Sequence, residues 1–106
     1  MPLPDYHAVV VIPSFNHGQT VVDIAARAAG LGLPVIVVDD GSTDDTQQRV
    51  LAWIATAKPA AWIVRHEVNS GKAAAIHRGA ALARELGATH IVTIDVRKTE
   101  AAAKSD

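Results

Sequence analysis

Residues 34–46 read PVIVVDDGSTDDT, and this stretch decides the fold class. Residues 34–39 form a short, almost uninterrupted apolar run with β-branched side chains, which predicts a strand covered on both faces. Residues 42–45 are a serine, a threonine and two aspartates. A hydroxyl N-cap and acids in the first turn are typical of a helix start, so we expect a helix over residues 42–57 with Ser42 as its N-cap.

The same alternation of strand and helix extends in both directions along the chain. Three more β-branched runs predict strands, and two more segments carry apolar residues at three- and four-residue steps that predict helices. The expected strands are residues 7–13, 34–39, 62–66 and 89–95, and the expected helices are residues 18–31, 42–57 and 71–86. This β-α-β-α-β-α-β order, with short loops and right-handed crossovers, predicts an α/β fold with a Rossmann-like, doubly wound parallel sheet.

Composition narrows the class of protein. The chain has 106 residues, 49% of them hydrophobic and 20% charged, so one domain with a packed core is expected. A net charge of −1 gives no electrostatic reason to expect nucleic acid or an anionic membrane as the main partner. The absence of cysteine excludes disulfides and thiolate metal sites. No apolar run is long enough to span a bilayer and the first residues lack a secretory pattern, so we predict a cytoplasmic domain.

Polar residues gather where the predicted strands end. They are Ser14, Asn16 and His17 after the first strand, Asp39, Asp40 and Ser42 after the second, Glu67, Asn69, Ser70, Gly71 and Lys72 after the third, and Asp95 at the fourth. In parallel α/β sheets, ligands bind outside the carboxyl ends of the strands. Loop polarity and helix capping would explain any one of these residues, but four clusters at one edge favour a binding site.

Three familiar kinds of site do not fit the spacing. A dinucleotide-binding turn needs G-x-G-x-x-G after the first strand, and residues 13–18 contain one glycine. A Walker-type phosphate loop would need glycine in place of His66 and a hydroxyl residue in place of Ala73, on either side of Gly71 and Lys72. A receiver domain would have paired acids after its first strand, whereas this chain has its pair after the second.

Taken as a set, the loops resemble a known family. The segments VVIPSFNHGQTV (10–21), VIVVDDGSTDDT (35–46), NSGKAAAIHRGAALA (69–83) and THIVTID (89–95) resemble the nucleotide-binding half of family 2 glycosyltransferases, which have the GT-A fold. Residues GKAAAIHRG and VTID are similar to the dolichol-phosphate mannosyltransferase-like branch. The resemblance covers residues 8–95 and implies the N-terminal half of a GT-A fold.

The resemblance implies a site for a nucleotide-diphosphate sugar, a UDP- or GDP-sugar. Asp40, supported by Asp39, would accept charge-assisted hydrogen bonds from the base, and Phe15 would pack on the base. Gly71 and Lys72 would lie against the ribose or diphosphate at a helix start. The implied binding residues are Pro13, Ser14, Phe15, Asn16, Asp39, Asp40, Gly71 and Lys72. From the residues alone, Asp39 could instead brace its loop, Phe15 could belong to the core, and Lys72 could be a solvated helix-start residue.

Asp95 is the position at which the chain departs from the family. Family members carry Asp-x-Asp, which holds Mg²⁺ or Mn²⁺ against the donor diphosphate. This chain reads Asp95-Val96-Arg97, and an arginine cannot ligate a cation. The resemblance therefore implies Asp95 as a metal ligand, while Arg97 puts the use of Mg²⁺ or Mn²⁺ in doubt. The histidines are not spaced as a metal site.

The implied function is that of a glycosyltransferase domain that binds a nucleotide-sugar donor for transfer to an acceptor. A membrane would be involved only through a lipid-linked acceptor. We expect a nucleotide-sugar-binding half-domain over residues 1–95 and a short charged tail over residues 96–106. The tail is similar to a Glu-Ala-Ala-Ala-Lys spacer, which leaves open whether it is native.

We expect a truncated domain that is weakly active or inactive as it stands, because the second aspartate, the acceptor half and the catalytic base of the family are not in the sequence. The catalytic residues are therefore unassigned. One alternative is a non-catalytic nucleotide-binding module that forms a homo-oligomer through the open edge of its fourth strand. Another is a truncated product that folds but has no role of its own.

Overall fold

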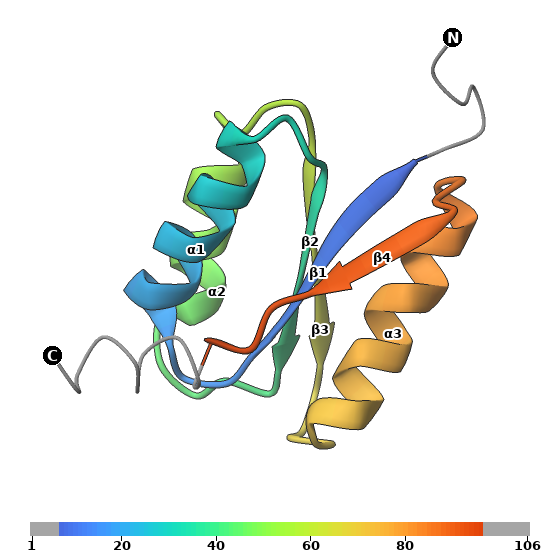
Figure 1. The fold of residues 1–106 in the computed structure, drawn as a ribbon. Coiled ribbons are helices and arrows are strands. Elements are labelled where there is room, and N and C mark those ends of the chain that lie inside the picture. Colours follow the sequence, from blue (N-terminus) through green and yellow to red (C-terminus); the bar gives the residue numbers. More distant parts are fainter. Residues whose placement is uncertain (1–6, 97–106) are drawn as a thin grey trace, which may run out of the picture.

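The computed structural model describes residues 7–96, in which strands and helices alternate (Figure 1). The elements are β1 (Ala8–Ser14), α1 (Gly18–Gly30), β2 (Val35–Asp40), α2 (Thr46–Ile54), β3 (Ala61–His66), α3 (Lys72–Glu85) and β4 (His90–Thr93). This is the predicted order, and the predicted α/β fold class is confirmed.

The strands form one parallel sheet in the order β3-β2-β1-β4. In the register, Val10 lies beside Val35 on one side of β1 and beside Val92 on the other. The chain moves outward from β1 to β3 and then crosses back to place β4 on the other side of β1. The strand order therefore reverses beside β1, which is where open α/β sheets bind ligands.

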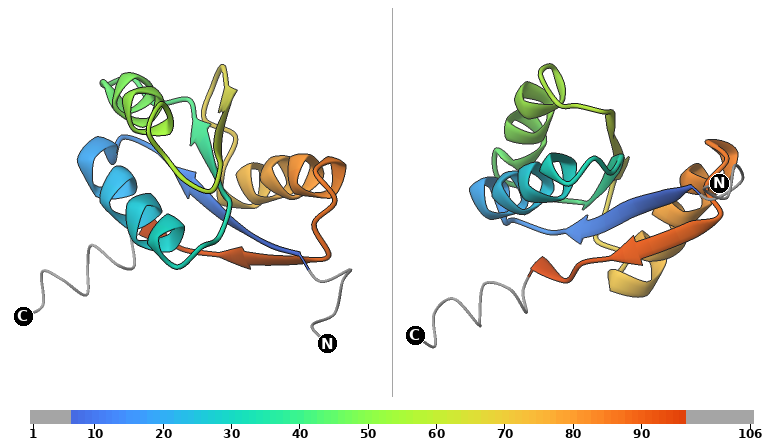
Figure 2. Two further views of the ribbon diagram at one scale, coloured as in Figure 1. Left: turned by 90° about the horizontal axis from the view of Figure 1, so that it is seen from above. Right: turned by 45° about the horizontal axis from the view of Figure 1, so that its top comes forward.

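Helices cover both faces of the sheet (Figure 2). On one face, α1 and α2 pack on a cluster that includes Val10, Ile12, Val35 and Val37. On the other face, α3 packs on a cluster of Val9, Val11, Ile36, Val38, Ala75 and Ala83. Successive residues of β1 and β2 therefore alternate between two cores, which explains why both strands are apolar throughout.

The closeness of α3 to the sheet depends on Gly79. A Cβ atom added to Gly79 would lie 2.4 Å from Val11 Cγ1 and 3.0 Å from Val38 Cγ2. Because no real Cβ approaches a methyl carbon so closely, only glycine lets the helix backbone rest directly on β1 and β2. Gly79 thereby fixes the position of α3, whose first residue is Lys72.

The predicted start of the second helix was wrong. The helix begins at Thr46, with Asp45 at the N-cap position, and not at residue 42. The Asp44 carboxylate accepts hydrogen bonds from the Thr46 backbone N–H (2.9 Å) and from the Thr46 hydroxyl. Ser42 is not a cap, because its hydroxyl accepts a hydrogen bond from the backbone N–H of Asn16 (2.9 Å) in another loop.

Two further predictions, the open sheet edge at the fourth strand and the tail over residues 96–106, concern the C-terminal part of the chain. Among the described strands β4 pairs with β1 alone, and its four residues are exposed, so it forms an open edge of the sheet. Of the predicted tail, Val96 is described and is buried, whereas residues 97–106 lie outside the described residues. Within residues 7–96 no helix combines the length and apolar character needed to cross a bilayer.

Candidate functional site

A cavity of about 570 Å³ lies at the carboxyl ends of β1 and β2, beside the start of α3. It is lined by Pro13, Ser14, Phe15, Asn16, His17, Asp40, Asn69, Gly71, Lys72, Ala75, Asp95 and Val96. Eight of the nine residues that the sequence suggested for a site are in this lining, and Asp39 is the exception. His17 and Asn69 belong to the strand-end clusters of the sequence but had no assigned role, and nothing in the sequence pointed to Ala75 or Val96.

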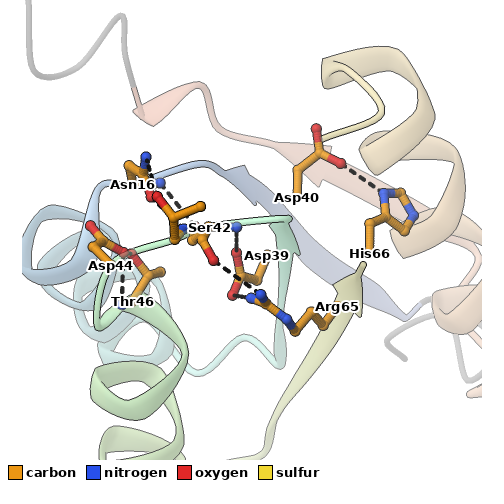
Figure 3. Close-up of polar contacts among 9 residues, drawn as sticks. Asn16, Asp39, Asp40, Ser42, Asp44, Thr46, Arg65 and His66 are labelled. Carbon is orange, nitrogen blue, oxygen red and sulfur yellow. Dashed lines mark hydrogen bonds and ion pairs between the residues drawn. The ribbon is translucent and has the colours of Figure 1, made fainter. Parts of the chain in front are cut away.

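Asp40 presents an ionised carboxylate to this cavity. Its Oδ1 accepts hydrogen bonds from Ser70 N–H (3.0 Å) and lies 2.8 Å from His66 Nδ1, and its Oδ2 accepts from Gly71 N–H (2.8 Å). Figure 3 shows the pair with His66 at the end of β3. Burial opposes ionisation of Asp40, but the hydrogen bonds from Ser70, His66 and Gly71 outweigh it and hold the pKa below its ordinary value. Asp40 therefore stays negative at neutral pH although it is almost fully buried.

Asp39 faces the other way and holds the loop after β2. Its side chain is fully buried, with Oδ1 accepting from Ser42 N–H (2.9 Å) and Oδ2 lying 2.6 Å from Arg65 Nη1. Arg65 also donates from Nη2 to the Ser42 carbonyl (3.0 Å), so one guanidinium bridges the carboxylate and the loop backbone (Figure 3). The described contacts of Asp39 are those of a loop brace.

Asn16 joins the loop after β1 to the loop after β2. Its backbone N–H donates to Ser42 Oγ (2.9 Å), and its side-chain Oδ1 accepts from Thr43 N–H (2.9 Å) (Figure 3). Asn16 has a φ of 55°, a left-handed conformation that asparagine adopts more readily than most residues. The preceding residue, Phe15, is 40% exposed beside the cavity, so it is not a core residue.

Two glycines shape the loops beside the cavity, Gly41 directly after β2 and Gly71 at the end of the loop after β3. Gly41 has a φ of 82°, and a Cβ atom there would lie 2.5 Å from the backbone nitrogen of Asn69. The absence of that atom lets the loops after β2 and β3 touch. Gly71, with a φ of 98°, is the N-cap residue of α3 and turns the chain into the helix. Backbone N–H groups at such a helix start favour anions.

Ser14 is a buried polar group without a described partner. It is 4% exposed, lies at the end of β1 and lines the cavity. Within residues 7–96 its Oγ makes no hydrogen bond. Since buried hydroxyls are normally paired, this oxygen is suited to bind a polar ligand atom that enters the cavity.

Asp95 lies in the cavity lining, opposite the start of α3. Its Oδ2 is 2.8 Å from Lys72 Nζ, and the two side chains are 32% and 62% exposed. The residues described here contain no group of three or more His, Cys, Asp or Glu side chains that could hold a metal ion. One carboxylate already paired with an ammonium, and followed two residues later by Arg97, is a poor donor set for Mg²⁺ or Mn²⁺. The described residues therefore do not fit the cation that the family resemblance implied.

Known proteins give an independent comparison. The chain is 34% identical over 88 residues to an uncharacterised protein of Methanocaldococcus jannaschii, a match that covers 82% of this chain and 38% of that protein. It also matches a mannosyltransferase from Pyrobaculum calidifontis, solved in complex with GDP-mannose and Mn²⁺, with 29% identity and a TM-score of 0.65. That match covers 91% of this chain and 29% of the mannosyltransferase chain. The chain thus spans well under half the length of either protein.

The sequence model of the family described as "Glycosyl transferase family 2" matches residues 9–96, which includes every lining residue of the cavity. The described strand order agrees with the N-terminal, Rossmann-like half of a GT-A glycosyltransferase. The resemblance predicted from the loops is confirmed, and the chain belongs to glycosyl transferase family 2.

Proposed function

We propose that the cavity at the carboxyl ends of β1 and β2 binds the nucleotide-diphosphate part of a sugar donor. The observation that carries this proposal is the meeting of unlike groups around one cavity: an ionised carboxylate at Asp40, a buried hydroxyl at Ser14 with no hydrogen-bond partner among the described residues, and a lysine at the first turn of α3. A volume of about 570 Å³ suits a ligand of nucleotide size.

In this proposal Asp40 selects the base. An ionised carboxylate offers about four lone-pair sites, and three described groups already approach its two oxygens. One acceptor position remains for an N–H of guanine or uracil, and a hydrogen bond to a charged acceptor is stronger than a neutral one. Phe15, exposed at the mouth, offers an aromatic face for the base.

The diphosphate would lie toward α3. Lys72 supplies a positive charge and the helix start supplies backbone N–H groups, while Gly71 has no side chain to block the approach. The structurally similar mannosyltransferase from Pyrobaculum calidifontis was solved in complex with GDP-mannose, which supports GDP-mannose as the first donor to test. For the whole protein we propose transfer of the donor's sugar to an acceptor, with the described residues holding the donor.

Isothermal titration calorimetry with GDP, UDP and GDP-mannose tests the proposal. Saturable binding by the wild-type chain is expected, and Asp40→Asn should weaken it by about 1.5–3 kcal/mol, the usual size of a hydrogen bond to a charged group. Asp45→Asn is the matched control, because Asp45 is exposed and lies outside the cavity. No binding of any of the three ligands at millimolar concentration would refute the proposal.

A further inference from the structure

The ion pair between Lys72 and Asp95 brings an ammonium group and a carboxylate together in the lining of the cavity. Lys72 Nζ lies 2.8 Å from Asp95 Oδ2, and both residues belong to the lining. The pair is neutral as a whole, so a divalent cation would have to displace the ammonium in order to reach the carboxylate. Arg97 follows two residues later, where a second carboxylate would be needed.

We propose that the Lys72 ammonium replaces the divalent cation of the family, so that this chain binds a nucleotide diphosphate without Mg²⁺ or Mn²⁺. The inference rests on the proposed function, because it concerns the same cavity and the same ligand. An ammonium has three N–H donors and can bind phosphate oxygens while it still contacts Asp95.

Two further features of the cavity suit a metal-free anion site. Lys72 is the first residue of α3, a helix of 14 residues, so the positive end of the helix dipole adds to the charge of the ammonium. Ser14 Oγ is buried in the same lining with no described hydrogen-bond partner, and it can donate to a phosphate oxygen. Lys72, the helix start and Ser14 together supply positive charge and donors, which a diphosphate requires.

The inference reverses the role of Asp95. As a metal ligand, Asp95 would hold the cation that attracts the diphosphate, and its loss would weaken binding. As the partner of Lys72 it competes with the diphosphate for the ammonium and repels it, so its loss should strengthen binding. The sign of the effect of Asp95→Asn therefore separates the two roles.

The experiment is calorimetric titration of the full chain with GDP, once in EDTA and once in Mn²⁺, for the wild type and three variants. Equal affinity in the two buffers is expected for the wild type. Lys72→Gln should weaken metal-free binding roughly 10- to 100-fold, the equivalent of losing a charged hydrogen bond. Asp95→Asn should tighten it about 3- to 10-fold, as expected for removing one nearby negative charge at a partly exposed site. Lys58→Gln, which alters an exposed lysine outside the cavity, should change nothing.

The outcomes distinguish this inference from the proposed function. Binding that requires Mn²⁺, or that weakens in Asp95→Asn, would overturn the metal-free site and leave donor binding intact. Failure of GDP, UDP and GDP-mannose to bind in either buffer would overturn both. Guanosine separates a charge effect from a structural one, because its affinity should be the same in Lys72→Gln and wild type. A parallel loss of guanosine binding would show that Lys72 acts on the fold and would also overturn the inference.

Discussion

Replacement of Arg65 by methionine should destabilise the protein more than any other loss of a single described ion pair. Asp39 is fully buried and Arg65 is 31% exposed, with 2.6 Å between Nη1 and Oδ2. Arg65→Met would leave the Asp39 carboxylate with the Ser42 N–H as its one described partner and would also remove a donor from the Ser42 carbonyl. Breaking a buried pair costs about 3–5 kcal/mol, and the partial exposure of Arg65 lowers our estimate to about 2–3 kcal/mol.

The control is another arginine in an ion pair with an aspartate. Arg49 lies 2.9 Å from Asp45, but these side chains are 45% and 59% exposed. Arg49→Met should therefore cost about 0.3–0.5 kcal/mol, the usual value for an exposed helical pair.

Urea unfolding followed by circular dichroism measures both free energies, and Arg65→Met should also lower the melting temperature by about 10–20 °C in a domain of this size. Adding Asp39→Asn to Arg65→Met should recover part of the loss, because the double variant no longer buries a poorly compensated charge. Equal costs for Arg65→Met and Arg49→Met would refute the role given to the buried pair.

Three further predictions concern the site and the packing beneath it. The pKa of Asp40 is lower in the folded than in the unfolded protein, so the ionised carboxylate stabilises the fold above its unfolded pKa. This contribution to stability is lost as the pH falls through the folded pKa. Asp40→Asn should therefore flatten the drop in unfolding free energy below about pH 4, measured by urea unfolding at a series of pH values. Gly79→Ala should cost about 1–3 kcal/mol of unfolding free energy through its clash with Val11, whereas Gly30→Ala should cost nothing, because no atom of residues 7–96 lies within 4 Å of the new Cβ. Ser14→Ala should leave stability unchanged or raise it by up to about 1 kcal/mol while weakening GDP binding about 3- to 10-fold. Equal losses of stability and binding would contradict the role of this hydroxyl, which has no partner in the described part of the chain.

The strands and their order along the chain were predictable because the signal is local. β1 and β2 are continuous β-branched runs, since each contributes alternate residues to two cores. The same logic placed the polar residues at one edge of the sheet. The start of α2 was not predictable, because the Ser42 hydroxyl is taken by Asn16, which lies 26 residues earlier in the chain.

The different roles of Asp39 and Asp40 also depend on neighbours that are distant in sequence. Successive residues of a strand point to opposite faces, so one of the two had to face away from the cavity. In the register of β2 and β3, Asp39 lies beside Arg65 and Asp40 beside His66. The charged end of the third predicted strand was the signal that could have identified these partners, but the register was needed to assign them. The pairing of Lys72 with Asp95 could not be predicted from the sequence either, because it depends on how the start of α3 lies relative to the segment after β4.

The location of nucleotide binding is the most direct test of the central claim. In an NMR titration of the isotope-labelled chain with GDP, the largest amide shift changes should occur at Ser14, Asn16 and Gly71, around the cavity. Gly32 and Gly87 line a second hollow at the opposite end of the sheet and should not respond. Shift changes centred on those two glycines, or no changes at all, would contradict the assignment of the donor site to the carboxyl ends of β1 and β2.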